Sequence, residues 1–115
     1  MYYILLSDVE LQEIAKQVIS IYASFKVTYG QEENSQISFD DDNKVYQLAL
    51  VEGYFEPELY LYIHMEIKNG LLWVNWDATE DFLLTQLEEH IPKEQIVLGF
   101  LEPEDRQESG YAIGE

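Results

Sequence analysis

The chain has no cysteine and few basic residues. The lack of cysteine excludes disulfide bonds, thiol catalysis and zinc sites built from cysteine. Only 6 of the 115 residues are Lys or Arg, against 23 Asp or Glu, so the formal net charge is −17. Proteins bind nucleic-acid phosphates mainly through Lys and Arg, so we expect no direct contact with DNA or RNA. Anionic membrane surfaces are disfavoured for the same reason.

Long apolar runs and linker sequences are also missing. No apolar run reaches the roughly 18–20 residues of a membrane-spanning helix. The N-terminal stretch has no basic region of the kind that opens a signal peptide. There is no Pro/Ser-rich linker and no internal repeat, so residues 1–115 are predicted to form one domain. Because a chain without cysteine suits a reducing compartment, we expect a cytoplasmic location.

Apolar and aromatic residues are abundant in spite of the charge. They make up 47% and 14% of the chain, with nine Tyr. This content excludes a disordered chain, and a domain of this length buries roughly two-thirds of the surface that its unfolded chain exposes. The acidity favours a basic protein partner, because complementary charge speeds encounter. Solubility alone is the other explanation for the acidity.

Two segments have the pattern of helices. Over residues 7–24, apolar residues recur every three or four positions. Ser7 and Glu10 have the spacing of a capping box, which marks the start of a helix. A second helix is predicted to end near His90, with Asp77 or Thr79 capping its start.

The remaining segments are typical of strands. The clearest is residues 58–68, where apolar and polar residues alternate, followed by the hairpin turn Asn69-Gly70 and a returning strand at 71–76. One face of the first strand would carry Leu59, Leu61, Ile63, Met65 and Ile67, and the other Tyr60, Tyr62, His64, Glu66 and Lys68. Further strands are predicted at 36–39, 44–51, 96–100 and 111–113, with a loop at 30–35. The order predicts an α+β fold: an antiparallel sheet of five or six strands with both helices packed on it.

An aromatic strand face is the candidate interaction surface. Tyr60, Tyr62 and His64 are predicted to share it, with one of the two tryptophans beside them, because Trp73 and Trp76 fall on opposite faces of their strand. Exposed aromatic faces are common in protein interfaces, and such a face would also permit a homodimer. Alternatively, the second helix or the C-terminal tail covers this face.

Three polar groups resemble fragments of known sites. His64 and Glu66 have the His-x-Glu spacing of zinc deaminases but lack the Pro-Cys-x-x-Cys motif. Residues 40–43 are acidic like a calcium loop, but the Gly is missing and Lys44 follows, so a solvated turn is predicted, with a weak cation site as the alternative. Asp77 and Glu80 have the spacing of a helix cap, and a catalytic carboxylate pair is the alternative. We therefore predict no metal, no cofactor and no catalytic residue.

The last third of the chain carries a more specific pattern. A strand with Trp73 leads to the sequence DATE, a helix, the run PKEQIVLGF and a Pro–Arg–Tyr-Ala ending. This order resembles the XisI family, the fdxN element excision controlling factors of cyanobacteria. The residues that carry the resemblance there include Trp73, Asp77, Thr79, Glu80, Pro92, Lys93, Gly99, Phe100, Pro103 and Arg106. Ala78 and Leu101 stand where the family usually has Gly and His.

The resemblance implies a non-enzymatic accessory role in the programmed excision of a DNA element, beside a site-specific recombinase. It also implies a partner, a XisH-like protein with a nuclease-like fold, and it supplies no catalytic residue. Two other functions stay open. One is an antitoxin-like inhibitor of a nuclease-fold partner, and the other is a carboxylate-dependent hydrolase that uses Asp77, Glu80 and His64.

Overall fold

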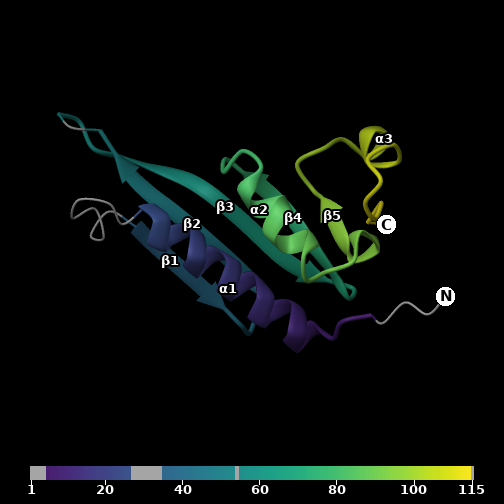
Figure 1. Cartoon of the computed structure of the whole chain (residues 1–115). Coiled ribbons are helices and arrows are strands. Elements are labelled where there is room, and N and C mark those ends of the chain that lie inside the picture. The colour runs from purple at the N-terminus through teal and green to yellow at the C-terminus, as the bar shows by residue number, and fades with distance from the viewer. Residues whose placement is uncertain (1–4, 27–34, 54, 115) are drawn as a thin grey trace.

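In the computed structural model of this protein, α1 and α2 lie on one face of a five-stranded sheet (Figure 1). The structure describes residues 5–26, 35–53 and 55–114. None of the helices in these ranges is long and apolar enough to cross a membrane. In chain order, the elements are α1 (Asp8–Lys26), β1 (Ser35–Asp40), β2 (Val45–Glu52), β3 (Glu58–Lys68), β4 (Leu71–Asp77), α2 (Phe82–Glu88), the 3₁₀ turn η2 (Lys93–Gln95), β5 (Ile96–Leu98) and α3 (Pro103–Arg106).

The predicted α+β fold is confirmed, with one difference in the sheet. The strands are ordered β1-β2-β3-β4-β5, and the first three neighbouring pairs are antiparallel. β5 is parallel to β4, so the sheet is mixed. A parallel neighbour requires a crossover connection, which α2 provides. The strand predicted at 111–113 is reduced to one bridge between Val97 and Ala112, and the loop predicted at 30–35 lies outside the described residues except for Ser35.

The capping box predicted at the start of α1 and the hairpin turn predicted between β3 and β4 are both confirmed. The backbone N–H of Ser7 donates to the Glu10 carboxylate (3.0 Å), and the N–H of Glu10 donates to the Ser7 hydroxyl (3.2 Å), which completes the capping box. Asn69 and Gly70 have φ values of 54° and 76°. Two successive positive φ angles are those of a type I′ turn, the tight turn that the Asn-Gly pair favours.

The core lies where the apolar stripes of α1 and α2 meet the sheet. Full burial of one such aliphatic side chain contributes about 1.5–3 kcal/mol. The buried side chains include Leu11, Ala15, Val18 and Ile19 of α1, Leu83 and Leu87 of α2, and Tyr46, Leu48, Ile63, Met65, Leu72, Val74 and Ile96 of the sheet. Gln95 is a buried polar residue among them, and its amide bonds both backbone groups of Leu6 and the carbonyl of Gly70.

A β-bulge at Tyr62 changes the direction of side chains in β3. Leu48 of β2 lies opposite Ile63, but the next residue, Ala49, lies opposite Leu61, so Tyr62 is the extra residue. A bulge inserts one residue and shifts the alternation by one position. Leu61 therefore lies with Ala49 on the face that the helices leave uncovered. The strict alternation predicted for this strand is wrong on the N-terminal side of the bulge.

A second bulge, at Asn75, has the same effect in β4. Trp73 lies opposite Glu66 and Trp76 lies opposite His64, although the two tryptophans are three positions apart. Directly opposed residues share a face of the sheet. Both tryptophans therefore lie on the face away from the helices, and the prediction of opposite faces is wrong.

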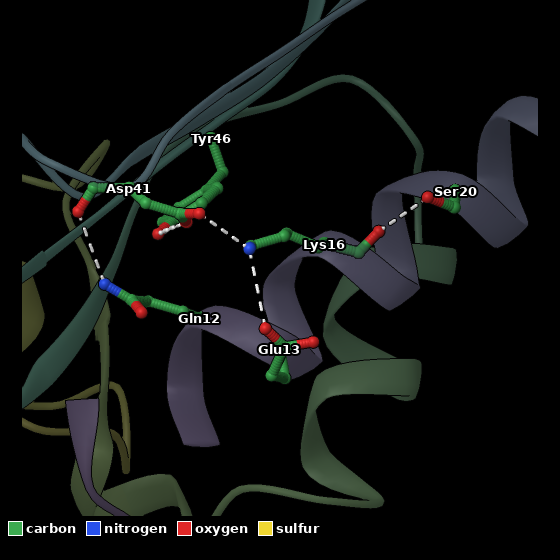
Figure 2. A network of polar contacts seen from close by, with 6 residues as sticks. All are labelled: Gln12, Glu13, Lys16, Ser20, Asp41 and Tyr46. Carbon is green, nitrogen blue, oxygen red and sulfur yellow. Dashed lines mark hydrogen bonds and ion pairs between the residues drawn. The ribbon is translucent and has the colours of Figure 1, made fainter. Parts of the chain in front are cut away.

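A polar network ties α1 to the turn between β1 and β2 (Figure 2). Lys16 Nζ lies 2.9 Å from the Asp41 carboxylate and 3.4 Å from that of Glu13. The hydroxyl of Tyr46 donates to Asp41 at 2.8 Å. The Gln12 amide adds a longer contact to the Asp41 carbonyl. Because the Tyr46 ring is in the core, Asp41 connects the acidic turn to both the helix and the buried face of the sheet.

Replacement of Asp41 by Asn should lower the urea midpoint near neutral pH. The hydrogen bonds from Lys16 and Tyr46 hold the pKa of Asp41 below its ordinary value. The native state therefore favours the carboxylate, and this stabilisation is present above the ordinary carboxyl pKa and is lost as the pH falls. The difference in urea midpoint should narrow as the pH falls below about 4, the ordinary pKa of an Asp carboxyl. Asp42→Asn, in the same turn, is the control, and an equal loss in both variants would contradict the prediction.

Candidate functional site

The face of the sheet that points away from α1 and α2, here called the open face, is the candidate site. Its residues follow from the strand register and the two bulges. They include Gln36, Ser38, Gln47, Ala49, Leu59, Leu61, His64, Glu66, Trp73, Asn75 and Trp76. The C-terminal segment contacts this face around Trp73, whereas the part formed by β1, β2 and the first half of β3 carries exposed side chains.

Trp73 is the centre of the contacted part. Lys68 Nζ lies 4.0 Å from the centroid of the indole ring, and the guanidinium carbon of Arg106 lies 5.2 Å from it. Cations at such distances are attracted by the ring, by about 0.5–2 kcal/mol each. Gly114 lies so close that a Cβ there would be 2.6 Å from the ring. The C-terminal segment is thus packed on the open face through one tryptophan.

Gly99 allows the chain to pass this tryptophan. A Cβ on Gly99 would lie 2.3 Å from Asn75 Oδ1 and 3.3 Å from the backbone oxygen of Val74. Two more residues of the family pattern have structural positions near this segment. Pro103 is the first residue of α3, and Lys93 Nζ lies 3.6 Å from the Glu88 carboxylate. Pro92 occupies the N-cap position of the 3₁₀ turn η2, and Phe100 is 44% exposed. These residues shape the C-terminal segment rather than a cavity.

Asp77 and Thr79 form the turn that starts α2. One carboxylate oxygen of Asp77 accepts hydrogen bonds from the N–H of Thr79 (2.8 Å) and from its hydroxyl (2.6 Å). The Thr79 oxygen then accepts the N–H of Leu83 (3.0 Å), a donor in the first turn of the helix that has no acceptor within the helix. Asp77 and Thr79 therefore brace the start of α2, whose N-cap position is Asp81 and not either of the two predicted residues.

Glu80 and His64 are not brought together. Glu80 lies beside the start of α2, with φ of 63°, and lines a cavity of about 330 Å³ with Tyr22, Tyr62, Ala78 and Thr79. His64 lies on the opposite face of the sheet, where its Nδ1 is 3.3 Å from the Asn75 amide. In the described part of the chain, no three His, Asp or Glu residues gather closely enough to hold a metal ion.

The predicted aromatic face is divided between the two sides of the sheet. Tyr62 packs against the core, with its ring centroid 6.2 Å from that of Tyr22 in α1. Its hydroxyl donates to the Glu52 carboxylate, and this bond, with partial burial, raises the pKa of Tyr62 to about 12. Tyr60 lies opposite the core residue Leu50 and is 46% exposed. The prediction that these tyrosines share a face with His64 is wrong, and the cause is the bulge at Tyr62.

Leu59 and Leu61 take the place of the tyrosines on the open face. They are 55% and 41% exposed, and Trp76 beside them is 49% exposed. The indole N–H of Trp76 donates to the carbonyl of Leu61 at 2.9 Å, which holds the ring against β3. A groove of about 400 Å³ lies here, lined by Gln36, Ile37, Ser38, Gln47, Ala49, Leu59 and Leu61. Sequence reasoning assigned both leucines to the core, because alternation alone carries no sign of the bulge.

The charges beside the groove are almost all negative. The chain has no Lys or Arg between residues 45 and 67. Glu52, Glu56 and Glu58, at the connection between β2 and β3, are all exposed. Figure 1 shows that this end of the β2–β3 hairpin extends beyond the end of α1. The end of this hairpin is therefore acidic, although the register places Glu52 and Glu58 on the side of Leu50 and Tyr60 and not on the open face itself.

The fold accommodates Ala78 and Leu101, which stand where the XisI family pattern usually has Gly and His. Among the described residues other than glycine, only Lys44, Asn69 and Glu80 have positive φ. Ala78 therefore has a backbone conformation that does not require glycine. Leu101 is partly buried and packs against the core.

The architecture is that of a small α+β protein in which two helices cover one face of a five-stranded sheet. The chain belongs to the XisI family, whose sequence profile, described as XisI protein, matches residues 8–113. No curated protein matches the sequence.

Two solved structures from Anabaena variabilis ATCC 29413 share the fold. The first, described as fdxN element excision controlling factor XisI, has a TM-score of 0.79 and 18% identity, with 92% of this chain and 97% of that chain covered. The second, described as a XisI-like protein, has a TM-score of 0.79 and 27% identity, with 92% and 98% covered.

The contacts of Thr79 predict a specific loss of stability. Thr79→Val keeps the shape of the side chain but leaves the N–H of Leu83 without an acceptor, so we expect a loss of about 1–2 kcal/mol in the free energy of unfolding, measured by urea titration. Thr85→Val, the same change at an exposed position of α2, should be close to neutral. Similar losses in the two variants would show that the hydroxyl of Thr79 has no special role.

Proposed function

We propose that this protein is a non-enzymatic accessory factor of the XisI type, which takes part in the programmed excision of a DNA element by binding a protein partner. The observation that carries the proposal is the uncovered part of the open face, where Leu59, Leu61 and Trp76 are about half exposed. Contiguous exposed apolar patches of this kind mark interaction sites. The excision role itself is taken from the family and from the printed description of one similar structure.

The charge of the chain favours a basic protein as the partner. At a net charge of −17, phosphate groups are repelled over most of the surface, so DNA is a poor direct ligand. A basic partner is attracted by this net charge, to which the exposed Glu52, Glu56 and Glu58 at the end of the β2–β3 hairpin contribute. A XisH-like protein is the partner that we propose. Its DNA-facing surface would have the complementary charge.

The polar residues of the last third support a binding role more than a catalytic one. Asp77 and Thr79 are bonded to each other and to the start of α2. His64 lies on the other face of the sheet from Glu80, so the arrangement that a hydrolase would need is not formed. An antitoxin-like inhibitor would use the same acidic and apolar surface. Loss of nuclease activity in the partner on binding would distinguish that function.

The proposal is tested by purifying the protein together with the XisH-like protein encoded beside it. We expect a complex at low ionic strength that weakens as salt is added, because screening reduces the attraction between opposite charges. Leu61→Lys should raise the Kd by about tenfold or more, since it places a cation in the groove that receives a basic partner.

Val9→Lys, at an apolar position of α1 that is 64% exposed, is the matched control and should bind normally. Isothermal titration calorimetry of both variants gives the comparison. Absence of any complex at low ionic strength would overturn the proposal, and equal binding by Leu61→Lys and the unchanged protein would remove the groove from it.

A further inference from the structure

The rows of directly opposed residues that cross the open face beside the groove carry no charged side chain, although 25% of the chain is charged. His64 is the one residue of these rows whose side chain can change its charge near neutral pH. The rows are Ser38, Gln47, His64 and Trp76, then Gln36, Ala49 and Leu61, and then Val51 and Leu59.

Two hydrogen bonds connect His64 to Glu66 through Asn75. The Asn75 side-chain nitrogen lies 2.9 Å from the Glu66 carboxylate and 3.3 Å from His64 Nδ1. Because a carboxylate only accepts hydrogen bonds, the Asn75 atom that faces it is the NH₂ group. The second hydrogen of this group is donated to His64 Nδ1, which must therefore carry a lone pair. The contacts thus select the neutral imidazole with its proton on Nε2.

The Nε2–H of His64 is available to a partner. Among the partly or fully buried residues that the structure describes, the buried side-chain atoms without a hydrogen-bond partner are Trp73 Nε1 and two nitrogens of Arg106. His64 is half-buried and its Nε2 has no acceptor in the described part of the chain, so this nitrogen reaches solvent. The N–H of the neighbouring Trp76 is already bonded to the Leu61 carbonyl. His64 therefore adds a hydrogen-bond donor to a surface that is otherwise apolar beside it.

The charged side chains of this part of the open face lie in the rows beyond His64. Glu66 follows on the same strand, and its carboxylate lies 3.5 Å from Lys68 Nζ. Arg106, from the C-terminal segment, lies over Trp73, which is directly opposite Glu66. The residues opposite His64 itself on β2 and β4 are uncharged, and α1 and α2 cover the other face. The environment of His64 is thus set mainly by Glu66 and by the Asn75 amide between them.

Protonation of His64 would change this surface in two ways. A proton on Nδ1 would bring two donors face to face, so Asn75 would have to present its oxygen instead. That oxygen now lies beside Gly99, and the rotation would break the bond to Glu66. The imidazolium would also place a positive charge in the uncharged rows, where a basic partner is repelled by it.

We infer that His64 is the polar anchor of the partner surface, meaning that its neutral imidazole donates the Nε2–H to a carbonyl oxygen of the partner and that protonation weakens the complex. A carbonyl fits because it accepts a hydrogen bond and is uncharged, like the rows around His64. The inference rests on the proposed function, because it specifies one contact of that surface and its pH dependence.

The tautomer is tested on the protein alone by nitrogen-15 NMR of the imidazole rings. At about pH 7.5 we expect Nε2 of His64 to carry the proton and Nδ1 to carry none. The chain has only two histidines, so His90→Gln assigns the signals. Asn75→Asp, which replaces the donating NH₂ by an oxygen, should draw a proton to Nδ1. A proton on Nδ1 in the unchanged protein at this pH would overturn the inference.

Calorimetry with the XisH-like protein at about pH 7.5 and about pH 5.5 tests the contact. Histidine gains its charge in this interval, so the Kd of the unchanged protein should rise by about fivefold or more. His64→Gln keeps an uncharged donor and should lose most of this rise. His90→Gln, at an exposed position after α2, should keep it. The partner titrates equally in all three measurements, so the difference between the variants reports His64.

An equal change of Kd with pH in His64→Gln and in the unchanged protein would overturn the inference while the proposed function stands. Tighter binding by the unchanged protein than by His64→Gln at the lower pH would do the same. Absence of a complex at both pH values would instead overturn the proposed function, and this contact with it. Circular dichroism at both pH values checks that the variants are folded, and the tautomer of the unchanged protein is measured without any change at His64.

Discussion

The apolar stripes of α1 and α2 are buried against a single face of the sheet, and the other features of the molecule follow from this one-sided packing. The two helices supply no cover for the second face. The C-terminal segment contacts part of it by packing Arg106, Gly99 and Gly114 around Trp73. The remainder, from β1 to the first half of β3, keeps its apolar side chains half exposed. A sheet that is covered on one side and only partly on the other has a ready surface for a partner.

The two bulges decide what that surface consists of. Without the extra residue at Tyr62, Leu59 and Leu61 would continue the buried row of Ile63, and the tyrosines would be on the open face. Tyr62 instead packs beside Tyr22, so an aromatic ring strengthens the core and two leucines are exposed. The bulge at Asn75 likewise brings Trp76 to the side of Trp73. Bulges are frequent beside functional sites because they redirect side chains in this way.

The residues by which the XisI family is recognised here have structural roles. Asp77 and Thr79 start α2, and Gly99 lets the chain pass Trp73. Their order along the chain was enough to predict the family, because it records the turns and close contacts that this fold requires. The proposed interaction surface lies elsewhere, on residues such as Leu61 that belong to no part of that pattern. The residues that identify the family therefore mark structural positions and do not locate the candidate site.

The sequence by itself determined the α+β class, the two helices, the capping box at Ser7 and the Asn69-Gly70 hairpin, since each depends on contacts between residues close in the chain. It also determined the acidity that argues against direct DNA binding. Only the tertiary structure decided which side chains face the helices. The bulges lie in the pairing of β3 with β2 and of β4 with β3, which local alternation does not record.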